Sequence, residues 1–347
     1  MSDVDALASA RAALRAWSLE GATLAPLGNG LINRTYLICA GEVRAVLQRV
    51  NAIFDPRIHE NIAAVTSRLR ERGLPTLSLV PTSDGRLWVE DGGVFRLYRH
   101  VDGATFEVIR SMAQARSAGE HVGAFHAALA ELPHRFVGMR LGVHDTPRHL
   151  ELLRRAVLEH RGHHLYSEVA PLAEELLSVA DALDPLPSLA PILGHGDLKL
   201  SNVLFSNERP DDALCLVDLD TVGPIHLGHE LGDLWRSWCN RATEDAPHAV
   251  LDLAVMGASF SGYVDGLGRA PTPTERLSAL LGPEWIALEL AARFAADALV
   301  ESYFGWNPAR YATRGEHNLA RARGQWALHG ALGGCRRARE ELLGVKS

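Results

Sequence analysis

The chain contains 347 residues, has a mass of 37.7 kDa, and combines 47% apolar with 22% charged residues. These proportions are ordinary for a soluble folded protein and exclude a fibrous or low-complexity one. The net charge of -7 and the pI near 6.1 argue against a nucleic-acid binder, whose surface is basic. No apolar segment follows a basic start, and no run reaches about 18 apolar residues, so we expect no membrane association and a cytoplasmic location.

The first hundred residues predict a small antiparallel β-lobe. Alternating apolar runs separated by turn residues, such as Gly28-Asn29-Gly30, are typical of hairpins. The expected strands cover residues 23–27, 31–38, 43–50, 77–81, 86–90 and 94–99, and the expected helices cover 4–17 and 56–71. We therefore predict a first domain, a nucleotide-binding β-lobe, over residues 1–103.

From residue 105 onward the apolar spacing is mainly helical. The expected helices cover residues 105–132, 146–160, 170–182, 228–239, 247–264, 284–304 and 317–343. Two short apolar runs, 203–205 and 214–217, predict a polar hairpin inside this helical region, and such a hairpin needs a functional reason. The overall prediction is an α+β protein with two lobes, the second of them a larger helical domain over residues 104–347.

The densest polar motif, HGDLKLSN at residues 195–202, precedes this hairpin, and Asp218 follows its second apolar run. Mg²⁺ prefers oxygen ligands and keeps phosphate oxygens and waters in its shell, so one Asp and one Asn from the protein are enough to hold it. A remaining Asp can then act as a base. The motif therefore predicts a site for a nucleotide with Mg²⁺.

Lysine is rare in this sequence, which has two lysines, Lys199 and Lys346, against 33 arginines. In such a background, a lysine is a candidate for chemistry that arginine cannot perform. Lys346 is the penultimate residue, whereas Lys199 lies inside the polar motif. We therefore expect Lys199 to belong to the site.

The string HGDLKLSN resembles the catalytic loop of the protein-kinase-like superfamily, in the HGD form typical of aminoglycoside phosphotransferases and choline kinases. The order of a β-lobe and then a helical lobe is the same. The resemblance implies that Asp197 accepts the proton of the acceptor hydroxyl and that Lys199 neutralises the transferred phosphoryl group. It implies Asn202 and Asp218 as Mg²⁺ ligands. His195 is expected to orient the loop through hydrogen bonds.

The β-lobe departs from the superfamily pattern because it contains no lysine. The run Ala45-Val46-Leu47-Gln48 stands in the place of the usual V-A-I-K strand. We therefore expect Gln48 or its neighbour Arg49 to contact the α- and β-phosphates of the nucleotide, and we expect no Lys–Glu ion pair of the usual kind.

A more specific resemblance covers roughly residues 25 to 330, over strings that include GNGLINRTYLI, VLQRVNAIFDPRIHENI, VHDTPRHLELL, HELGDLWRSWCN and RFAADALVESYF. These strings are similar to the N-acetylhexosamine 1-kinase family, which phosphorylates the anomeric hydroxyl of N-acetylglucosamine or N-acetylgalactosamine with ATP and Mg²⁺. The residues that the resemblance implies for the small-molecule acceptor are Arg293, Tyr303, Asp233 and Arg236. Those that it implies for the nucleotide are Gly28, Asn29, Gly30, Asn33, Thr35, Gln48 and Arg49.

Other interpretations remain open at this stage. The run of residues 218–221 fits the DxDxT motif of haloacid-dehalogenase-type phosphatases, although that fold normally begins with the motif. His160, His163 and His164 have helical spacing that a zinc site would use, without a supporting carboxylate or cysteine pattern. Within the superfamily, choline, homoserine or an aminoglycoside is an alternative acceptor and would require an acidic or aromatic pocket. The missing lysine also allows an inactive, kinase-like binding protein.

Overall fold

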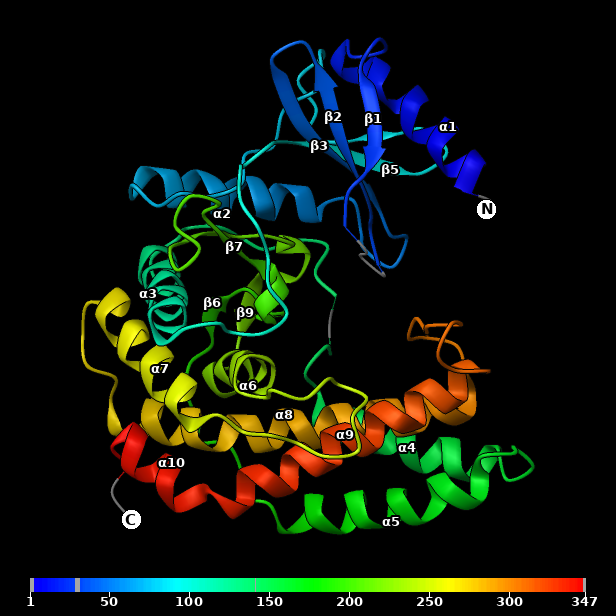
Figure 1. The fold of residues 1–347 in the computed structure, drawn as a ribbon, viewed down its shortest axis with the longest axis vertical. Helices are drawn as coiled ribbons and strands as arrows, with labels where there is room; N and C mark the ends of the chain where they lie inside the picture. Colours follow the sequence, from blue (N-terminus) through cyan, green and yellow to red (C-terminus); the bar gives the residue numbers. More distant parts are fainter. Residues whose placement is uncertain (1–2, 29–31, 141, 346–347) are drawn as a thin grey trace.

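The computed structural model describes residues 3–28, 32–140 and 142–345, which form a small and a large lobe (Figure 1). The small lobe is built on a five-stranded antiparallel sheet with the strand order β1-β2-β3-β5-β4. Its strands are β1 (Thr23–Pro26), β2 (Arg34–Ala40), β3 (Val43–Val50), β4 (Val89–Glu90) and β5 (Val94–Arg99).

The two faces of this sheet have different neighbours. Because side chains alternate along a strand, Leu47 and Phe95 point to one face, and Gln48 and Arg96 point to the other. Helix α1 (Asp3–Ala13) and the short η1 (Leu14–Trp17) cover the first face, where Leu47 and Phe95 are fully buried. Helix α2 (Ile58–Glu71) lies between the sheet and the large lobe (Figure 1). The face with Gln48 and Arg96 is therefore turned toward the large lobe.

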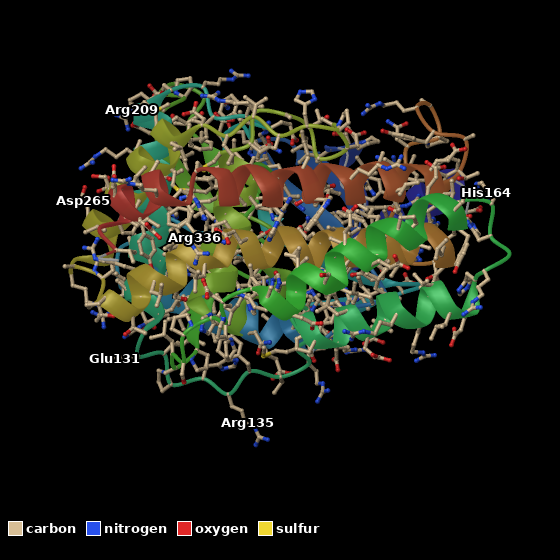
Figure 2. The ribbon with its side chains drawn as sticks, turned by 90° about the horizontal axis from the view of Figure 1, so that it is seen from below. Glu131, Arg135, His164, Arg209, Asp265 and Arg336 are labelled. Atoms are coloured by element: carbon tan, nitrogen blue, oxygen red, sulfur yellow. The ribbon has the colours of Figure 1, made fainter. Side chains whose placement is uncertain are left out.

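The large lobe consists of helices arranged around α8 (Pro273–Val300), which packs against α4, α5, α6 and α9. The remaining helices are α3 (Met112–Leu129), α4 (Thr146–Glu159), α5 (Tyr166–Ala182), α6 (Leu227–Trp238), α7 (Leu253–Leu267), α9 (Arg314–Gly334) and α10 (Arg336–Leu343). Figure 2 shows this layer from below, with charged side chains such as Glu131, Arg135 and Asp265 at its edges. Among the helices that the structure describes, none combines the length and the apolar character needed to cross a bilayer.

Helices α3 and α7 approach each other through glycines. A Cβ atom at Gly262 would lie 1.9 Å from the carbonyl oxygen of Arg116, and one at Gly119 would lie 2.0 Å from that of Ser259. No side chain fits at such distances, so these two positions need glycine. Helix α3 also packs against the polar hairpin, and the close contact with α7 gives that hairpin a rigid support.

Two short antiparallel strand pairs carry the polar motif. Strand β6 (Ile192–Gly194) pairs with β9 (Gly223–Ile225), and β7 (Val203–Phe205) pairs with β8 (Ala213–Leu216). The one-turn helices η2 (Leu200–Asn202) and η3 (Leu219–Thr221) lie in the connections. The predicted hairpin is confirmed, and the pairing brings residues 195–202 and 217–222 to the same side of the large lobe.

Several helix limits differ from the sequence prediction for local reasons. Helix α8 begins at Pro273 rather than at 284, because Thr272 and Glu275 form a reciprocal capping box there. It ends at Val300 rather than at 304, because the carboxylate of Asp297 binds the backbone of the next residues. The helix expected over 317–343 is two helices, α9 and α10, separated at Cys335.

Two further differences concern the first lobe and its exit. The expected strand 77–81 is reduced to one bridge between Leu79 and Tyr98, and the expected strand 86–90 to the two residues of β4. Helix α3 begins at Met112, where Ser111 accepts a hydrogen bond from Gln114, and not at 105. Residue Ala104 instead pairs with Phe205 of the hairpin. The division of the chain after residue 103 stays a prediction.

Candidate active site

Three polar side chains of the predicted catalytic loop lie together. The Nζ atom of Lys199 lies 3.0 Å from Oδ2 of Asp197. The amide nitrogen of Asn202 donates to the same oxygen at 3.0 Å and to the backbone carbonyl of Asp197 at 2.8 Å. Burial opposes ionisation of Asp197, but the charge of Lys199 outweighs it and lowers the pKa of this carboxyl group. Asp197 is therefore a carboxylate at neutral pH and can accept a proton.

Helix α6 holds this loop through a buried carboxylate that sequence analysis did not single out. Glu230 accepts the backbone N–H groups of His195 at 2.7 Å and of Gly196 at 2.9 Å. Gly196 has a φ of +81°, which a side chain would strain. Burial alone would raise the pKa of Glu230, but the hydrogen bond with His126 helps to lower it, so the anchor is charged. In the sequence, the only indication of this role is that Glu230 belongs to the string HELGDLW, which is part of the family resemblance.

His195 has the orienting role that was predicted. Its fully buried ring donates from Nε2 to the carbonyl oxygen of Val217 at 2.8 Å, and its Nδ1 accepts the N–H of Asp197 at 3.3 Å. From the end of α6, the indole N–H of Trp238 donates to the carbonyl oxygen of Leu198 at 2.8 Å. The loop is thus fixed on both sides of Asp197.

Asp218 lies after β8 in a left-handed backbone conformation, with φ of 62°. Burial and the charges of Asp220 and Asp197 raise the pKa of Asp218 to about 6. The neighbouring carboxylates thus add to the effect of burial, and the nearby cations Lys199 and Arg96 offset it only in part. The amide nitrogen of Asn202 donates to Asp197. Its side-chain carbonyl oxygen is therefore available, beside the Asp218 carboxylate, as a second oxygen ligand for a cation.

A hydrogen-bonded row crosses the inner face of the small sheet and ends on the large lobe. Gln48 donates to Thr35 at 3.1 Å, and Arg96 donates to the side-chain oxygen of Gln48 at 2.9 Å. The fully buried guanidinium of Arg96 forms an ion pair with Asp220. Asn33 donates to the other oxygen of Asp220 at 2.7 Å. The row thus joins three strands to the loop between β8 and β9.

Arg96 is a small-lobe cation that sequence analysis missed. It lies on β5 directly opposite Gln48, so a charge that β3 lacks is present on the neighbouring strand. Burial and the charge of Arg96 lower the pKa of His59 on α2 to about 4, so this nearby residue is neutral. The carboxylate partner of Arg96 is Asp220 from the large lobe. In the sequence, the only indication of this cation is an arginine within the apolar strand VFRLYR.

Arg49 lies on the face of the small sheet opposite to Gln48. Its guanidinium donates to the carbonyl oxygen of Gly92 at 2.7 Å and lies 5.9 Å from the ring centre of Phe95. Because neighbouring side chains of a strand point to opposite faces, Gln48 and Arg49 cannot both face the large lobe. The strand geometry therefore favours Gln48, with its neighbour Arg96, for the face turned toward the large lobe, and the contact of Gln48 or Arg49 with the nucleotide stays a prediction.

The other residues predicted for the nucleotide have mixed outcomes. Gly28 has a left-handed backbone, with φ of +72°, at the end of the first hairpin strand. Asn33 and Thr35 belong to the hydrogen-bonded row. The predicted contacts of these residues with the nucleotide stay predictions, and Asn29 and Gly30 lie outside the described residues.

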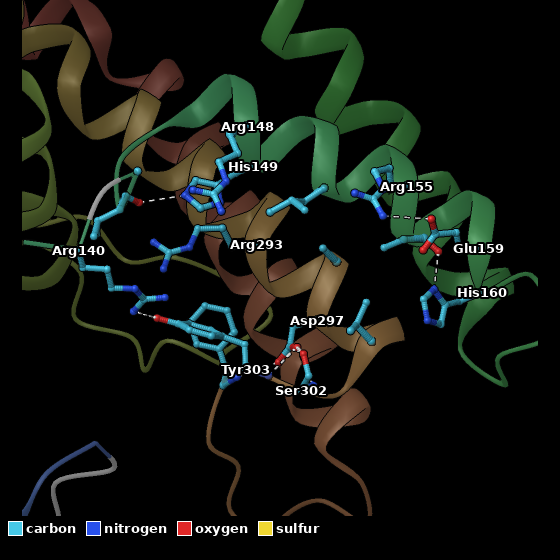
Figure 3. Close-up of a pocket in the computed structure, with 17 residues that line it drawn as sticks. Arg140, Arg148, His149, Arg155, Glu159, His160, Arg293, Asp297, Ser302 and Tyr303 are labelled. Carbon is cyan, nitrogen blue, oxygen red and sulfur yellow. Dashed lines mark hydrogen bonds and ion pairs between the residues drawn. The ribbon is translucent and has the colours of Figure 1, made fainter. Parts of the chain in front are cut away.

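Two cavities share part of their lining, and one of them reaches the catalytic loop. One, of about 340 Å³, reaches Gly196. The other, of about 410 Å³, contains both Arg293 and Tyr303 (Figure 3), so the structure brings these two predicted acceptor residues together. Arg140 and Gly142 line both cavities, so the space near the catalytic loop borders directly on the space between α4 and α8.

Asp233 and Arg236, also predicted for the acceptor, bind each other at 2.8 Å and line neither of these two cavities. They lie close enough to the catalytic loop to act on it through charge. Burial would lower the pKa of Lys199, but carboxylates that include Asp197 and Asp233 raise it. A direct contact of Asp233 or Arg236 with the acceptor stays a prediction.

A small sheet that faces a helical lobe across a loop of this composition is the arrangement of the protein-kinase-like phosphotransferases. The predicted fold class is thus confirmed. The model of the phosphotransferase enzyme family, APH, matches residues 23–261. The chain belongs to this family of small-molecule phosphotransferases.

Solved structures with the same fold cover nearly the whole chain. A microcompartment-associated aminopropanol kinase is 18% identical, with a TM-score of 0.64 over 95% of this chain and 98% of its own. An aminoglycoside phosphotransferase from Alicyclobacillus acidocaldarius is 16% identical, with a TM-score of 0.58 over 94% and 96%. The amicoumacin kinase hAmiN, in complex with AMP-PNP, Ca²⁺ and amicoumacin, is 12% identical, with a TM-score of 0.59 over 95% and 94%. At these identities the likeness concerns the fold.

Proposed function

We propose that the protein transfers the γ-phosphoryl group of ATP, with Mg²⁺, to the anomeric hydroxyl of an N-acetylhexosamine or a related sugar. The observation that carries this proposal is the cluster of Asp197, Lys199 and Asn202 beside the cavities that lead to Arg293 and Tyr303. The nucleotide and the divalent cation in the amicoumacin kinase support the choice of cosubstrates. The resemblance to N-acetylhexosamine 1-kinases supports the sugar.

The donor set fits Mg²⁺. The Asp218 carboxylate and the Asn202 carbonyl are hard oxygen ligands of the kind that this ion prefers. Burial and the repulsion of the nearby Asp220 and Asp197 carboxylates raise the pKa of Asp218, and a divalent cation bound there would stabilise its charged form. Bound there, Mg²⁺ would neutralise phosphate oxygens of the nucleotide.

The chain's own residues would act on the acceptor and on the leaving nucleotide as follows. Asp197 takes the hydroxyl proton while the acceptor oxygen forms its bond to the γ-phosphorus, and the bond from that phosphorus to the β–γ bridging oxygen breaks to release ADP. Lys199 places its charge beside the transferred group. Glu230 holds the loop, so that Asp197 keeps its position during the reaction.

The cavity lining disfavours the cationic acceptors that the fold also serves. Four arginines and two carboxylates line the larger cavity: Arg140, Arg148, Arg155, Arg293, Glu159 and Asp297. Choline or an aminoglycoside would bring positive charge to this excess of guanidinium groups, and like charges repel. This lining supports a neutral or negatively charged acceptor over an amine.

The chemistry of the product tests the proposed function. With N-acetylglucosamine or N-acetylgalactosamine and MgATP, we expect the reducing-sugar signal to fall in step with ADP formation, and the new phosphate to be released by mild acid. The methyl glycosides of the same sugars, whose anomeric oxygen is blocked, are the matched control and should not react. A product that keeps its reducing end, or turnover only with choline or an aminoglycoside, would overturn the anomeric assignment.

A further inference from the structure

Three arginines from different segments converge at one end of the larger cavity. Arg148 comes from α4, Arg293 from α8, and Arg140 from the connection between α3 and α4 (Figure 3). A neutral sugar needs hydrogen-bond donors, which many side chains provide, but it does not need three positive charges. The balance of charge around these arginines therefore decides what the cavity can bind.

The carboxylate nearest to Arg293 is already engaged. Glu289 lies 3.5 Å from Arg293 and is fully buried. Its other oxygen accepts the Thr146 hydroxyl at 2.7 Å, and the oxygen nearest to Arg293 also lies 3.1 Å from His144. Glu289 thus holds Arg293 in place from behind, and the guanidinium still lines the cavity.

Arg140 and Arg148 have no carboxylate partner among the residues that the structure describes. Arg140 donates to the Tyr303 hydroxyl and stacks on its ring at 4.9 Å from the ring centre. Arg148 lies against the backbone of Gly142, where a Cβ would come within 2.8 Å of its Nη1 atom. Both guanidinium groups line the cavity and can donate to a ligand.

Among the described residues, the two acidic residues of the lining form no ion pair with Arg140, Arg148 or Arg293. Asp297 is buried and accepts the backbone N–H groups of residues 302–304 and the Asn318 amide, so its oxygens are satisfied within the protein. Glu159 lies 3.3 Å from Arg155. In Figure 3 this pair lies at the opposite end of the cavity from Arg140.

One wall of the cavity is apolar and unusually exposed. Leu152, Val300 and Tyr303 are each about two-fifths exposed, and all three line this cavity. Large apolar side chains left open beside unpaired arginines suit a ligand that combines an anionic group with an apolar part.

We propose that the acceptor carries an anionic group, a carboxylate or a phosphate, which Arg140 and Arg148 bind while its hydroxyl faces Asp197. The proposal rests on the proposed function, because it takes this cavity as part of the acceptor site. The planar guanidinium matches both anions with two parallel hydrogen bonds, which are stronger when charged. The acceptor class is thus an acidic sugar derivative.

Matched pairs of sugars test the proposal, both by turnover and by calorimetric binding to the full chain in the presence of MgADP. The carboxylate arm compares N-acetylmuramic acid with N-acetylglucosamine, and glucuronic acid with glucose. The phosphate arm compares N-acetylglucosamine 6-phosphate with N-acetylglucosamine. In at least one of these pairs, we expect the acidic sugar to bind about tenfold or more tightly than the neutral sugar, because a hydrogen bond to a charged group contributes that much. The arm that shows the preference identifies the anion.

Variants on one helix separate the site from general charge effects. Arg148→Gln should reduce the acid-to-neutral preference about tenfold, and Arg148→Lys should restore part of it. Arg154→Gln is the matched control, because Arg154 lies on the same helix, is exposed, pairs with Glu151 at 3.5 Å, and lines neither cavity. This control should leave the preference unchanged.

The outcomes for the two proposals are distinguishable. Equal binding of acid and neutral sugars, or an equal effect of the Arg148 and Arg154 variants, overturns the anionic acceptor, even when N-acetylglucosamine is phosphorylated and the proposed function stands. Preferential binding of an acid that requires Arg148, without phosphorylation of any sugar, supports the anion site and overturns the proposed kinase reaction.

Discussion

The two halves of the candidate active site are assembled in different ways. Most of the large-lobe half comes from one short string, since residues 197–202 supply Asp197, Lys199 and Asn202, one helix holds this loop, and only Asp218 is added from further along the chain. The small-lobe half is a row over three strands that ends in the pair of Arg96 and Asp220. The first half can therefore be recognised as a motif in the sequence, whereas the second depends on which strands pair and in which register.

The two halves also differ in how far their charged side chains are exposed to solvent. The side chains of Asp197 and Lys199 remain 32% and 38% exposed, as groups that must meet a substrate. Those of Arg96 and Asp220 are 0% and 3% exposed, as groups that join two parts of a protein. We therefore expect changes in the first half to act mainly on rate, and changes in the second half to act on stability as well as on rate.

The largest effect on rate is expected from Asp197→Asn. The kcat should fall by about 10²- to 10⁴-fold, the usual contribution of a positioned base, while calorimetry should show ATP affinity close to that of the wild type. Urea unfolding serves as the control for an intact fold. Single-turnover rates within about tenfold of the wild type would show that Asp197 is not the base.

Arg96→Met should show the contrast on the other side of the site. Removal of the guanidinium leaves Asp220 buried without its cation, which should lower the free energy of unfolding by about 3–5 kcal/mol in urea titrations. In the double variant Arg96→Met with Asp220→Leu, most of the stability should return, because no buried charge remains unpaired, and the activity should not. Recovery of both would mean that the pair has no part in the reaction.

The metal assignment predicts a selective effect of Asp218→Ala. The Mg²⁺ concentration that gives half-maximal rate should rise about tenfold or more, because a carboxylate ligand is lost. Asp212→Ala is the control, since Asp212 lies on the loop between β7 and β8 and pairs with Arg209 at the surface. An unchanged Mg²⁺ dependence in the Asp218 variant would contradict its role as a ligand.

The smallest effect is expected from Arg49→Ala. Because Arg49 contacts Gly92 and Phe95 on the outer face, the KM for ATP should stay within about twofold of the wild type, as for most surface substitutions. Gln48→Ala interrupts the row to Arg96 and should change the KM for ATP more. A larger effect at Arg49 than at Gln48 in steady-state kinetics would reverse the assignment of the two faces.

The same contrast explains what sequence could predict. The bilobal fold and the loop of residues 195–202 follow from local patterns: alternation, turn glycines and one dense polar string. Arg96 depends on which strand pairs with β3, and β5 lies more than forty residues away along the chain. The cavity arginines Arg140 and Arg148 share a cavity with Arg293 of α8 only after α4 and α8 pack, so no local pattern marks this site. The start of helix α8, which precedes the predicted start at 284, does have a local signal, the capping box of Thr272 and Glu275.

The exposed position of Lys199 has a consequence for chemical labelling. It is the only lysine among the described residues, and its amine borders the site, so an amine-acylating reagent has a single internal target there. Burial would lower the pKa of Lys199, but the charges of Asp197 and Asp218 raise it, so acylation needs alkaline solution. Removing the Asp197 charge should speed acylation at a given pH. A modified peptide that contains residue 199 then reports, in a single mass spectrum, whether a ligand shields the site.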